Sequence, residues 1–391
     1  MSGLRRLLGA LAVLPALALA APAQGSLTPV SGPHPAGPSL AGTLSGVVTV
    51  SEKQIAVTVS YSGANDEAWA RSVLGGVDSG LPALVKATGY PYPGPGSIRI
   101  DQRTEEDIHG YAGSAACNIS YCRIRLTTTS GELTLLHELA HLWTQPFEKR
   151  WLSEGYAEYA SMEAAALLGL TSKPVFAGYG VGTPSIPLSE WDHPINLLTA
   201  GGEEIVAEYE GYDYSYQLFL LLEDAAGAEN LTAANAILFS EQTPYTVGSR
   251  LYMDTLEDVS GVNLDDVFVR WVLGDGTAAL VAQRREARDR LASLRAQAEP
   301  LGLAVNESIQ EHIEKWEFDE ALDILARNEA NLAAYAEMTA ALDGLRPEIE
   351  RAGLPYPRAF DEAAETWDFG DIRDALPDAR AAVEAYEEAK R

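Results

Sequence analysis

The chain has 391 residues, 47% of them hydrophobic and 21% charged, which excludes disorder of the whole chain and allows two or three globular domains. Its 56 acidic and 28 basic residues give a formal net charge of −28 at pH 7, which disfavours nucleic acid or an anionic membrane as a partner, because both are bound through clustered lysines and arginines. Two cysteines are too few for a disulfide-rich scaffold or a zinc site of four thiolates.

Residues 1–23 have the pattern of a secretory signal peptide. Arg5 and Arg6 precede an apolar run, and residues 21–23 offer small side chains before a cut, with residues 18–20 as the competing site. We therefore expect a secreted or periplasmic protein, on the exterior of the cell or in its envelope. No later apolar stretch reaches the ~20 residues of a membrane span, so no integral membrane segment is expected after signal removal. A retained N-terminal anchor is the alternative.

The next segments predict a short extended region, two strands and a helix. Residues 24–45 are rich in proline and glycine and are expected to form an extended lead-in. Residues 47–61 alternate and are rich in β-branched side chains, which predicts two short strands around a turn. A helix is predicted from about residue 67 to residue 88, with Asn65 or Asp66 as its cap.

Further strands are predicted over residues 97–101 and 122–128, and helices dominate afterwards. The approximate helical ranges are 132–143, 153–168 with Ser153 as its cap, 203–209, 214–226 and 256–271. Strands that come first and helices that come later indicate an α+β domain, here spanning residues 46–276.

Residues 277–391 are predicted to form an all-α domain. At an offset of 51 residues, segment 301–338 aligns without a gap with segment 352–389, and tryptophan, phenylalanine and tyrosine positions match in both copies. This self-similarity predicts a duplicated helical hairpin, whose copies stack on each other and on a helix over residues 280–298. The aromatic residues are expected in the core, and a groove that binds a protein partner is the alternative.

Two cysteines and three asparagines are candidates for covalent modification. Cys117 and Cys122 lie in a β-prone stretch, and an oxidising compartment would allow a short disulfide that pins a hairpin or strand edge. Two buried thiols are the alternative. Asn118, Asn230 and Asn306 begin glycosylation triplets, which matter only if the source glycosylates its exported proteins.

The string LLHELAHLW, residues 135–143, points to a metal site. His137 and His141 are four residues apart, so on a helix both imidazoles project from one face, one turn apart, as two ligands of a single ion require. Glu138 lies beside them, where its carboxylate can take a proton from a water activated by the ion. The alternative is a helix with two hydrogen-bonded surface histidines.

A third protein ligand is expected because catalytic zinc keeps its fourth position for water. Glu154 follows His141 by 13 residues, at the start of the next predicted helix, and Glu158 lies one turn further on the same face. Both carboxylates cannot be equally close to one ion. We expect Glu154 to be the ligand and Glu158 to orient a ligand imidazole, with a solvated helix residue as the alternative for Glu158.

HELAHLW followed by WLSEGYAEY resembles the gluzincin zinc peptidases, in particular the aminopeptidase-N-like and peptidase-MA-like branch, and residues 97–126 resemble the strand, loop and edge strand that precede the motif there. The resemblance implies a zincin-like catalytic domain, with a small N-terminal sheet, an active-site helix and a mostly helical C-terminal lobe. It also implies one zinc ion per chain, with His137, His141 and Glu154 as ligands and Glu138 as the general base.

The same branch often uses a tyrosine, about fifteen residues before a glycine, to stabilise the oxyanion. Tyr212 lies 15 residues before Gly227 and fits this pattern, while Tyr214 and Tyr216 are nearby alternatives. The aminopeptidase pattern is incomplete, because no G-x-M-E-N strand is present to bind a free amino terminus. This departure favours an endopeptidase over an aminopeptidase.

The sequence therefore predicts an exported zinc metallopeptidase that acts on peptide or protein substrates. The strand near residues 113–126 is expected to pair with an extended peptide. One alternative is a catalytically silent binding or scaffold protein on a peptidase-like fold, with the helical repeats docking a partner. Another is a zinc enzyme that hydrolyses a non-peptide amide or ester, which the ligand set alone does not exclude.

Overall fold

The computed structural model describes residues 20–21, 42–63, 65–173, 182–241, 246–355 and 370–391. The predicted signal peptide and lead-in lie outside the described residues except at their ends. The chain divides into two compact units, Met1–Asp275 and Gly276–Arg391. Within the described ranges, no helix has both the length and the apolar content needed to cross a bilayer.

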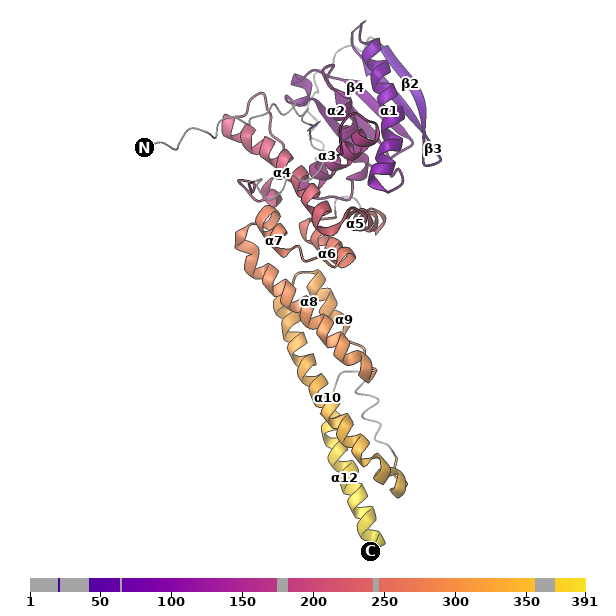
Figure 1. Ribbon diagram of the computed structural model, residues 1–391, viewed down its shortest axis with the longest axis vertical. Helices are drawn as coiled ribbons and strands as arrows, with labels where there is room; N and C mark the ends of the chain where they lie inside the picture. The colour runs from indigo at the N-terminus through magenta and orange to yellow at the C-terminus, as the bar shows by residue number, and fades with distance from the viewer. Residues whose placement is uncertain (1–19, 22–41, 64, 174–181, 242–245, 356–369) are drawn as a thin grey trace, which may run out of the picture. The chain divides into compact units, whose positions relative to one another are not determined.

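The first unit contains a mixed β-sheet, of which β2, β3 and β4 are labelled in Figure 1. Its strand order is β1-β5-β6-β4-β3-β2. Its strands are β1 (Ala20–Ala21), β2 (Gly42–Val50), β3 (Lys53–Tyr61), β4 (Ser97–Gln102), β5 (Gly113–Cys117) and β6 (Cys122–Leu126). Strands β3, β4 and β6 run parallel, whereas β2 is antiparallel to β3 and β5 is antiparallel to β6. The two residues of β1 pair in parallel with the outer edge of β5.

Alternation along the strands separates an apolar face of the sheet from a polar one. Val59, Ile100 and Ile124 are in register on neighbouring strands, and all three are completely buried. The residues one step along, such as Asp101 and Arg125, are also in register and face the other side of the sheet. The helices that follow pack against the apolar face.

The helices of the first unit carry the candidate site. They are α1 (Glu67–Thr88), α2 (Glu132–Ala140), α3 (Arg150–Leu167), α4 (Gly202–Ala226), α5 (Ala228–Glu241), α6 (Ser249–Ser260) and α7 (Asp265–Phe268). Helix α2 continues as a 3-10 turn over His141–Trp143, so the predicted helix 132–143 is α-helical only as far as Ala140. Helices α1, α2 and α3 pack on one another, and α3 also packs on α4 (Figure 1).

A glycine next to the candidate ligand Glu154 lets two helices approach closely. A Cβ atom on Gly155 would lie 2.7 Å from the backbone oxygen of Ser215 and 3.0 Å from the ring of Phe219. Any larger residue at position 155 would push α4 away from α3. This close approach brings the Tyr212 region of α4 up to the helix that carries Glu154.

The helix that carries Glu154 begins three residues earlier than predicted. Helix α3 starts at Arg150, Lys149 is its N-cap residue, and no side chain caps it. Ser153 was the predicted cap but lies within the first turn, where its hydroxyl donates to Thr144 Oγ1 at 3.0 Å. The prediction was wrong because the whole first turn is buried and is held in place by packing rather than by a cap.

Three further boundaries differ from the predictions. The predicted helices 203–209 and 214–226 form the single helix α4. Strand β2 begins at Gly42, inside the range expected to be a lead-in. Asp66 is the N-cap residue of α1, but its carboxylate accepts hydrogen bonds from Gly63 and Gln102 instead of capping the helix.

The second unit is all-α in its described residues. Its helices are α8 (Ala278–Ala298), α9 (Glu307–Glu314), α10 (Phe318–Ala352) and α12 (Gly370–Lys390). Helix α10 packs along α8, α9 and α12 (Figure 1). Residues 356–369 of the second predicted repeat copy, 352–389, lie outside the described residues, so the duplication stays a prediction.

Candidate metal centre

The three predicted ligands meet at one buried point between α2, its 3-10 turn and α3. Glu154 Oε2 lies 3.3 Å from His137 Nε2 and 3.5 Å from His141 Nε2. One ligand atom from each residue lies within 4.8 Å of the others. All three residues are at most 3% exposed. The structure therefore brings together the two histidines and the distant carboxylate as the sequence predicts.

Local geometry and core packing position these side chains together. The four-residue spacing puts both imidazoles on one side, and their ring centroids lie 5.0 Å apart. Leu139 lies between the two histidines and Leu142 directly follows the second; both are completely buried and anchor the segment in the core. Trp151 and Leu152 are also completely buried and anchor the first turn of α3, which brings the next residues against α2.

The second nitrogen of each imidazole is hydrogen-bonded away from the cluster. His137 Nδ1 lies 2.7 Å from Glu158 Oε2, so the ring N–H donates to that carboxylate. His141 Nδ1 lies 3.2 Å from Thr144 Oγ1, whose hydroxyl in turn donates to the His141 carbonyl. Both rings are thus fixed with Nε2 toward Glu154. Glu158 contacts a histidine ring, as the sequence suggested, whereas the contact of Thr144 with His141 was not predicted.

Several polar atoms in this cluster have no hydrogen-bond partner among the described residues. They are His141 Nε2, Glu154 Oε1 and both carboxylate oxygens of Glu138. Unpaired buried polar atoms are costly, and each one in a folded protein needs an explanation. Two imidazoles and one carboxylate are a donor set that zinc accepts in hydrolytic sites. These residues therefore fit a divalent cation such as zinc.

The ionisation of the cluster also suits a cation. Burial favours the neutral form of Glu154, but the neighbouring His141 and a hydrogen bond from His137 lower its pKa below the usual range. Burial disfavours protonation of His137, but hydrogen bonds to Glu154 and Glu158 raise its pKa. Without an ion, these contacts favour a proton on His137. Binding a metal would displace that proton, as ligand exchange at such sites requires.

Glu138 lies beside the cluster with a different environment from Glu154. It is completely buried, and burial raises the pKa of its carboxyl group well above the usual range, with a further contribution from Glu154. Gly113 of β5 packs against it, since a Cβ atom there would lie 2.5 Å from Glu138 Oε1. The edge of the sheet therefore comes directly up to this carboxylate.

A buried ion pair lies next to the cluster and was not predicted. Arg150 pairs with Glu208, and its Nη2 also donates to the Tyr212 hydroxyl at 3.2 Å. Glu208 accepts further hydrogen bonds from Tyr111 at 2.5 Å and from Trp191 at 3.1 Å. Both charged residues are nearly completely buried, so each depends on the other for compensation. In the sequence, this ion pair was indicated by a charged residue, Arg150, directly before the WLSE string.

Tyr212 is the one of the three candidate tyrosines that this ion pair holds in place. Burial and the negative charge of Glu154 raise its pKa well above the usual range. Tyr214 packs edge-on against Trp271, with ring centroids 5.6 Å apart. The pKa of Tyr216 is raised by burial and by the charge of Glu158. The hydrogen bond from Arg150 distinguishes Tyr212 from Tyr214 and Tyr216.

The predicted disulfide is present at the edge of the sheet. Cys117 of β5 and Cys122 of β6 are paired in register and joined by a disulfide bond. Between them, Asn118 Oδ1 accepts hydrogen bonds from the backbone N–H groups of Ser120 and Tyr121. The bond and the turn hold the β5–β6 hairpin together beside Glu138.

Among known proteins, similarity to this chain was found only in solved structures. No family model and no curated protein matches the chain. A point mutant of an M1 zinc metallopeptidase from Deinococcus radiodurans aligns with 18% sequence identity and a TM-score of 0.41, over 59% of this chain and 52% of that chain. The same enzyme without the mutation aligns with 18% identity and a TM-score of 0.39, over 56% of this chain and 49% of that one.

A two-domain M1 zinc metallopeptidase mutant bound to L-arginine gives the same identity of 18% and TM-score of 0.39, over 56% of this chain and 49% of that chain. The present chain therefore spans about half the length of the structures it matches. These alignments extend over 56–59% of this chain at TM-scores of 0.39–0.41. Independently of them, the buried His137, His141 and Glu154 are consistent with an HExxH motif followed by a glutamate ligand.

Proposed function

We propose that this protein is an exported zinc-dependent metallopeptidase that cleaves within peptide or protein chains. The observation that carries the proposal is the buried convergence of His137, His141 and Glu154, with the unpaired carboxylate of Glu138 beside them. A protein without catalysis has no physical reason to keep three ligands and a base together in its core. A metal site built for hydrolysis would follow from these residues whatever the substrate is.

The residues suggest a division of labour in hydrolysis. His137, His141 and Glu154 would hold the zinc ion, which when bound polarises a water molecule and the scissile carbonyl group. Glu138 would accept the proton of the attacking water and deliver it to the departing amine, because its oxygens have no other partner among the described residues. Tyr212, held by Arg150, would donate a hydrogen bond to the developing oxyanion.

The edge of β5 supports cleavage within a chain rather than at its end. An extended peptide that pairs with this edge would continue on both sides of the bond next to Glu138. The pairing of Ala20–Ala21 with Gly113 and Ser114 illustrates that the backbone there can bind a parallel strand. The chain also contains no G-x-M-E-N string to bind a free amino terminus.

The proposal is tested by metal analysis together with a cleavage assay. We expect the purified protein to contain one zinc ion per chain and to cleave casein or a peptide library, with activity lost to a chelator and restored by zinc. Glu154→Ala should lose both zinc and activity. Glu163→Ala changes a carboxylate on the same helix that pairs with Lys173, and it should keep both.

Other outcomes would contradict specific parts of the proposal. One tightly bound zinc ion without cleavage of any peptide would favour a silent scaffold or an enzyme acting on another amide or ester. If Glu154→Ala binds zinc as tightly as the parent, the third ligand lies elsewhere. For export, the secreted protein should begin near residue 24, and an intact N-terminus in the mature protein would contradict cleavage of the signal.

A further inference from the structure

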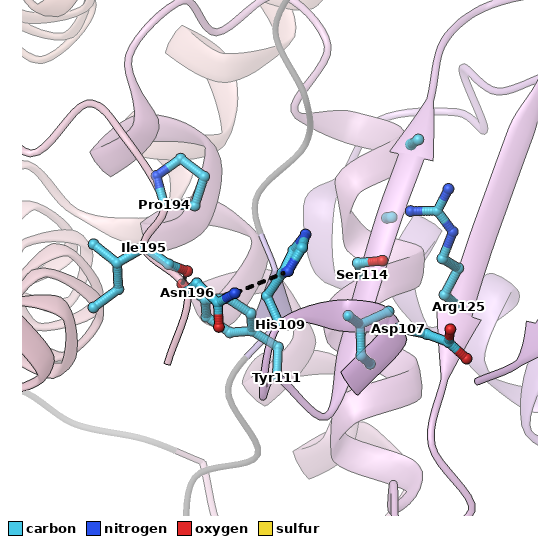
Figure 2. Close-up of a pocket in the computed structure, with 11 residues that line it drawn as sticks. Asp107, His109, Tyr111, Ser114, Arg125, Pro194, Ile195 and Asn196 are labelled. Atoms are coloured by element: carbon cyan, nitrogen blue, oxygen red, sulfur yellow. Dashed lines mark hydrogen bonds between the residues drawn. The ribbon is translucent and has the colours of Figure 1, made fainter. Parts of the chain in front are cut away.

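A pocket of about 280 Å³ lies on the side of β5 that faces away from the metal centre (Figure 2). Its floor includes Ser114 of β5 and Arg125 of β6, and its walls include His109 and Asn196 from two loops. Ser114 and Arg125 are paired in register on adjacent strands, so their side chains share the polar face of the sheet. In the view of Figure 2, Ser114 lies between His109 and Arg125.

Arg125 brings an uncompensated positive charge to this pocket. It is half-buried and forms no ion pair or side-chain hydrogen bond among the described residues. The nearest acidic group, Asp101, already pairs with Arg99 at 2.8 Å and with Arg123 at 2.6 Å. Burial and the like charges of Arg123 and Arg103 lower the pKa of Arg125, as expected for a cation without its own counter-ion.

The other polar groups of the pocket are mainly hydrogen-bond donors. Ser114 is 8% exposed, and its hydroxyl forms no hydrogen bond within the described part of the chain. His109 Nδ1 lies 3.4 Å from Asn196 Nδ2, so it accepts from the amide and leaves Nε2–H as a donor. The one carboxylate on the rim, Asp107, accepts the backbone N–H of Thr104 at 3.2 Å. Such a donor set fits a carboxylate ligand.

The pocket begins one residue from the metal centre. Gly113 packs against Glu138, and Ser114 is its direct neighbour on β5. Ala21 pairs with Ser114 in a parallel register, so a strand residue at that position has its side chain on the Ser114 face. A peptide that binds along this edge would thus place one side chain next to Ser114, on the face that carries Arg125 on the following strand, while its neighbour faces Glu138.

From this geometry we propose that the Arg125 pocket is a specificity subsite for a carboxylate of the substrate, either an Asp or Glu side chain or the C-terminal carboxylate. The inference rests on the proposed peptidase function. Four arginines lie around Asp101 on this face and Asp107 lies on the rim, so positive charges outnumber negative ones here although the chain carries a net charge of −28. An acidic group is attracted here and repelled by most of the remaining surface.

Binding tests the subsite without requiring turnover. Fluorescent peptides that differ only by Glu, Gln or Lys at each position in turn are titrated against the zinc-loaded Glu138→Gln protein, followed by anisotropy. We expect one position at which Glu binds about tenfold more tightly than Gln, and Arg125→Gln should abolish this preference. Arg125→Glu should reverse it in favour of Lys. Peptides with a free or an amidated C-terminus distinguish a terminal carboxylate from a side chain.

Arg99→Gln is the matched control, because Arg99 lies on the same face but pairs with Asp101 and does not line the pocket. If this variant loses the preference for Glu as completely as Arg125→Gln, the preference comes from the general positive charge of this face and the subsite is overturned. Equal binding of the Glu and Gln peptides at every position would also overturn it. Cleavage by the parent protein is measured on the same peptides. If the protein shows the binding preference but cleaves none of the peptides, the peptidase proposal is refuted and the subsite stands. If it cleaves them without a preference that depends on Arg125, the subsite is refuted and the peptidase proposal stands.

Discussion

The two ring nitrogens of each histidine in the cluster have different neighbours. Nδ1 is held by Glu158 in His137 and by Thr144 in His141, and Nε2 faces Glu154 in both. A carboxylate that accepts the Nδ1 proton fixes the ring orientation and makes the other nitrogen a stronger ligand. The affinity of this cluster for zinc would therefore depend on Glu158 and Thr144 as well as on the ligands themselves.

Replacing Glu158 tests this dependence. Glu158→Gln keeps the size of the side chain but removes the charge that accepts from His137 Nδ1. We expect the dissociation constant for zinc to rise 10- to 100-fold, measured by competition with a chromophoric chelator. Glu163→Gln on the same helix should leave it unchanged. Unaltered zinc affinity in Glu158→Gln would mean that this contact does not tune the ligand.

Replacing Glu138 distinguishes the proposed role of this residue as the base from the role of the three residues proposed to bind zinc. Glu138→Gln should keep one zinc ion per chain and lower kcat/KM by a factor of about 10²–10⁴, because an amide cannot accept the proton of the attacking water. Since the carboxylate makes no hydrogen bond within the described residues, the thermal midpoint of unfolding should change little. Activity within tenfold of the parent, with zinc retained, would assign the base elsewhere.

At the scale of the elements, the two faces of the sheet in the first unit have different roles. The apolar face of β3, β4 and β6 supports the helices that carry the metal ligands, whereas the opposite face collects arginines around Asp101. Strand β5 is the element that links them, because Gly113 contacts Glu138 and Ser114 lines the pocket. The disulfide between Cys117 and Cys122 fixes the far end of this strand.

The buried Asp101 predicts a pH-dependent contribution to stability. Burial raises its pKa, but the hydrogen bonds from Arg99 and Arg123 outweigh burial and lower it overall. The stabilisation by the ionised form is therefore fully present above the unfolded pKa of about 3.9 and is lost as the pH falls through the lower folded value. Asp101→Asn should reduce the free energy of unfolding by about 2 kcal/mol at pH 7.

Urea denaturation of the parent and of Asp101→Asn at several pH values measures this contribution. The difference between the two proteins should be the same at pH 7 and pH 5, and smaller at pH 3. A difference that stays constant down to pH 3 would show that the ionised carboxylate is not the stabilising species.

At the scale of the whole molecule, every residue of the candidate site lies in the first unit. The ligands and Glu138 come from α2, its 3-10 turn and α3, and Tyr212 comes from α4, all before Asp275. The second unit supplies none of these side chains. Metal binding is therefore expected to be a property of the first unit.

A chain that ends at Asp275 tests this expectation. With free zinc at 100 times its dissociation constant, this chain should gain about 2.7 kcal/mol of stability, which corresponds to a rise of roughly 5–10 °C in the midpoint of thermal unfolding. Calorimetry with zinc and with a chelator measures the shift, and Glu154→Ala in the same chain should show none. A shift that appears only in the full-length chain would place part of the metal site in the second unit.

Local geometry explains how much of the site the sequence determines by itself. Residues four apart on a helix share a face whatever surrounds them, so the HELAH string alone puts His137 and His141 on one side. The disulfide between Cys117 and Cys122 is also local, because a tight hairpin brings its two strand ends together. Glu154 was predicted from its place at the start of the next helix, 13 residues after His141, and the family resemblance agreed with that choice.

Only the tertiary structure decides the contacts between distant elements. The predicted helices 203–209 and 214–226 left a gap that the structure does not have, because Gly211 packs against the ring of Trp191 and α4 runs through it. The Arg150–Glu208 ion pair and the Arg125 pocket each join residues from separate elements. Such contacts arise because burial of apolar faces fixes which strands and helices become neighbours, and no pattern within a single element records that choice.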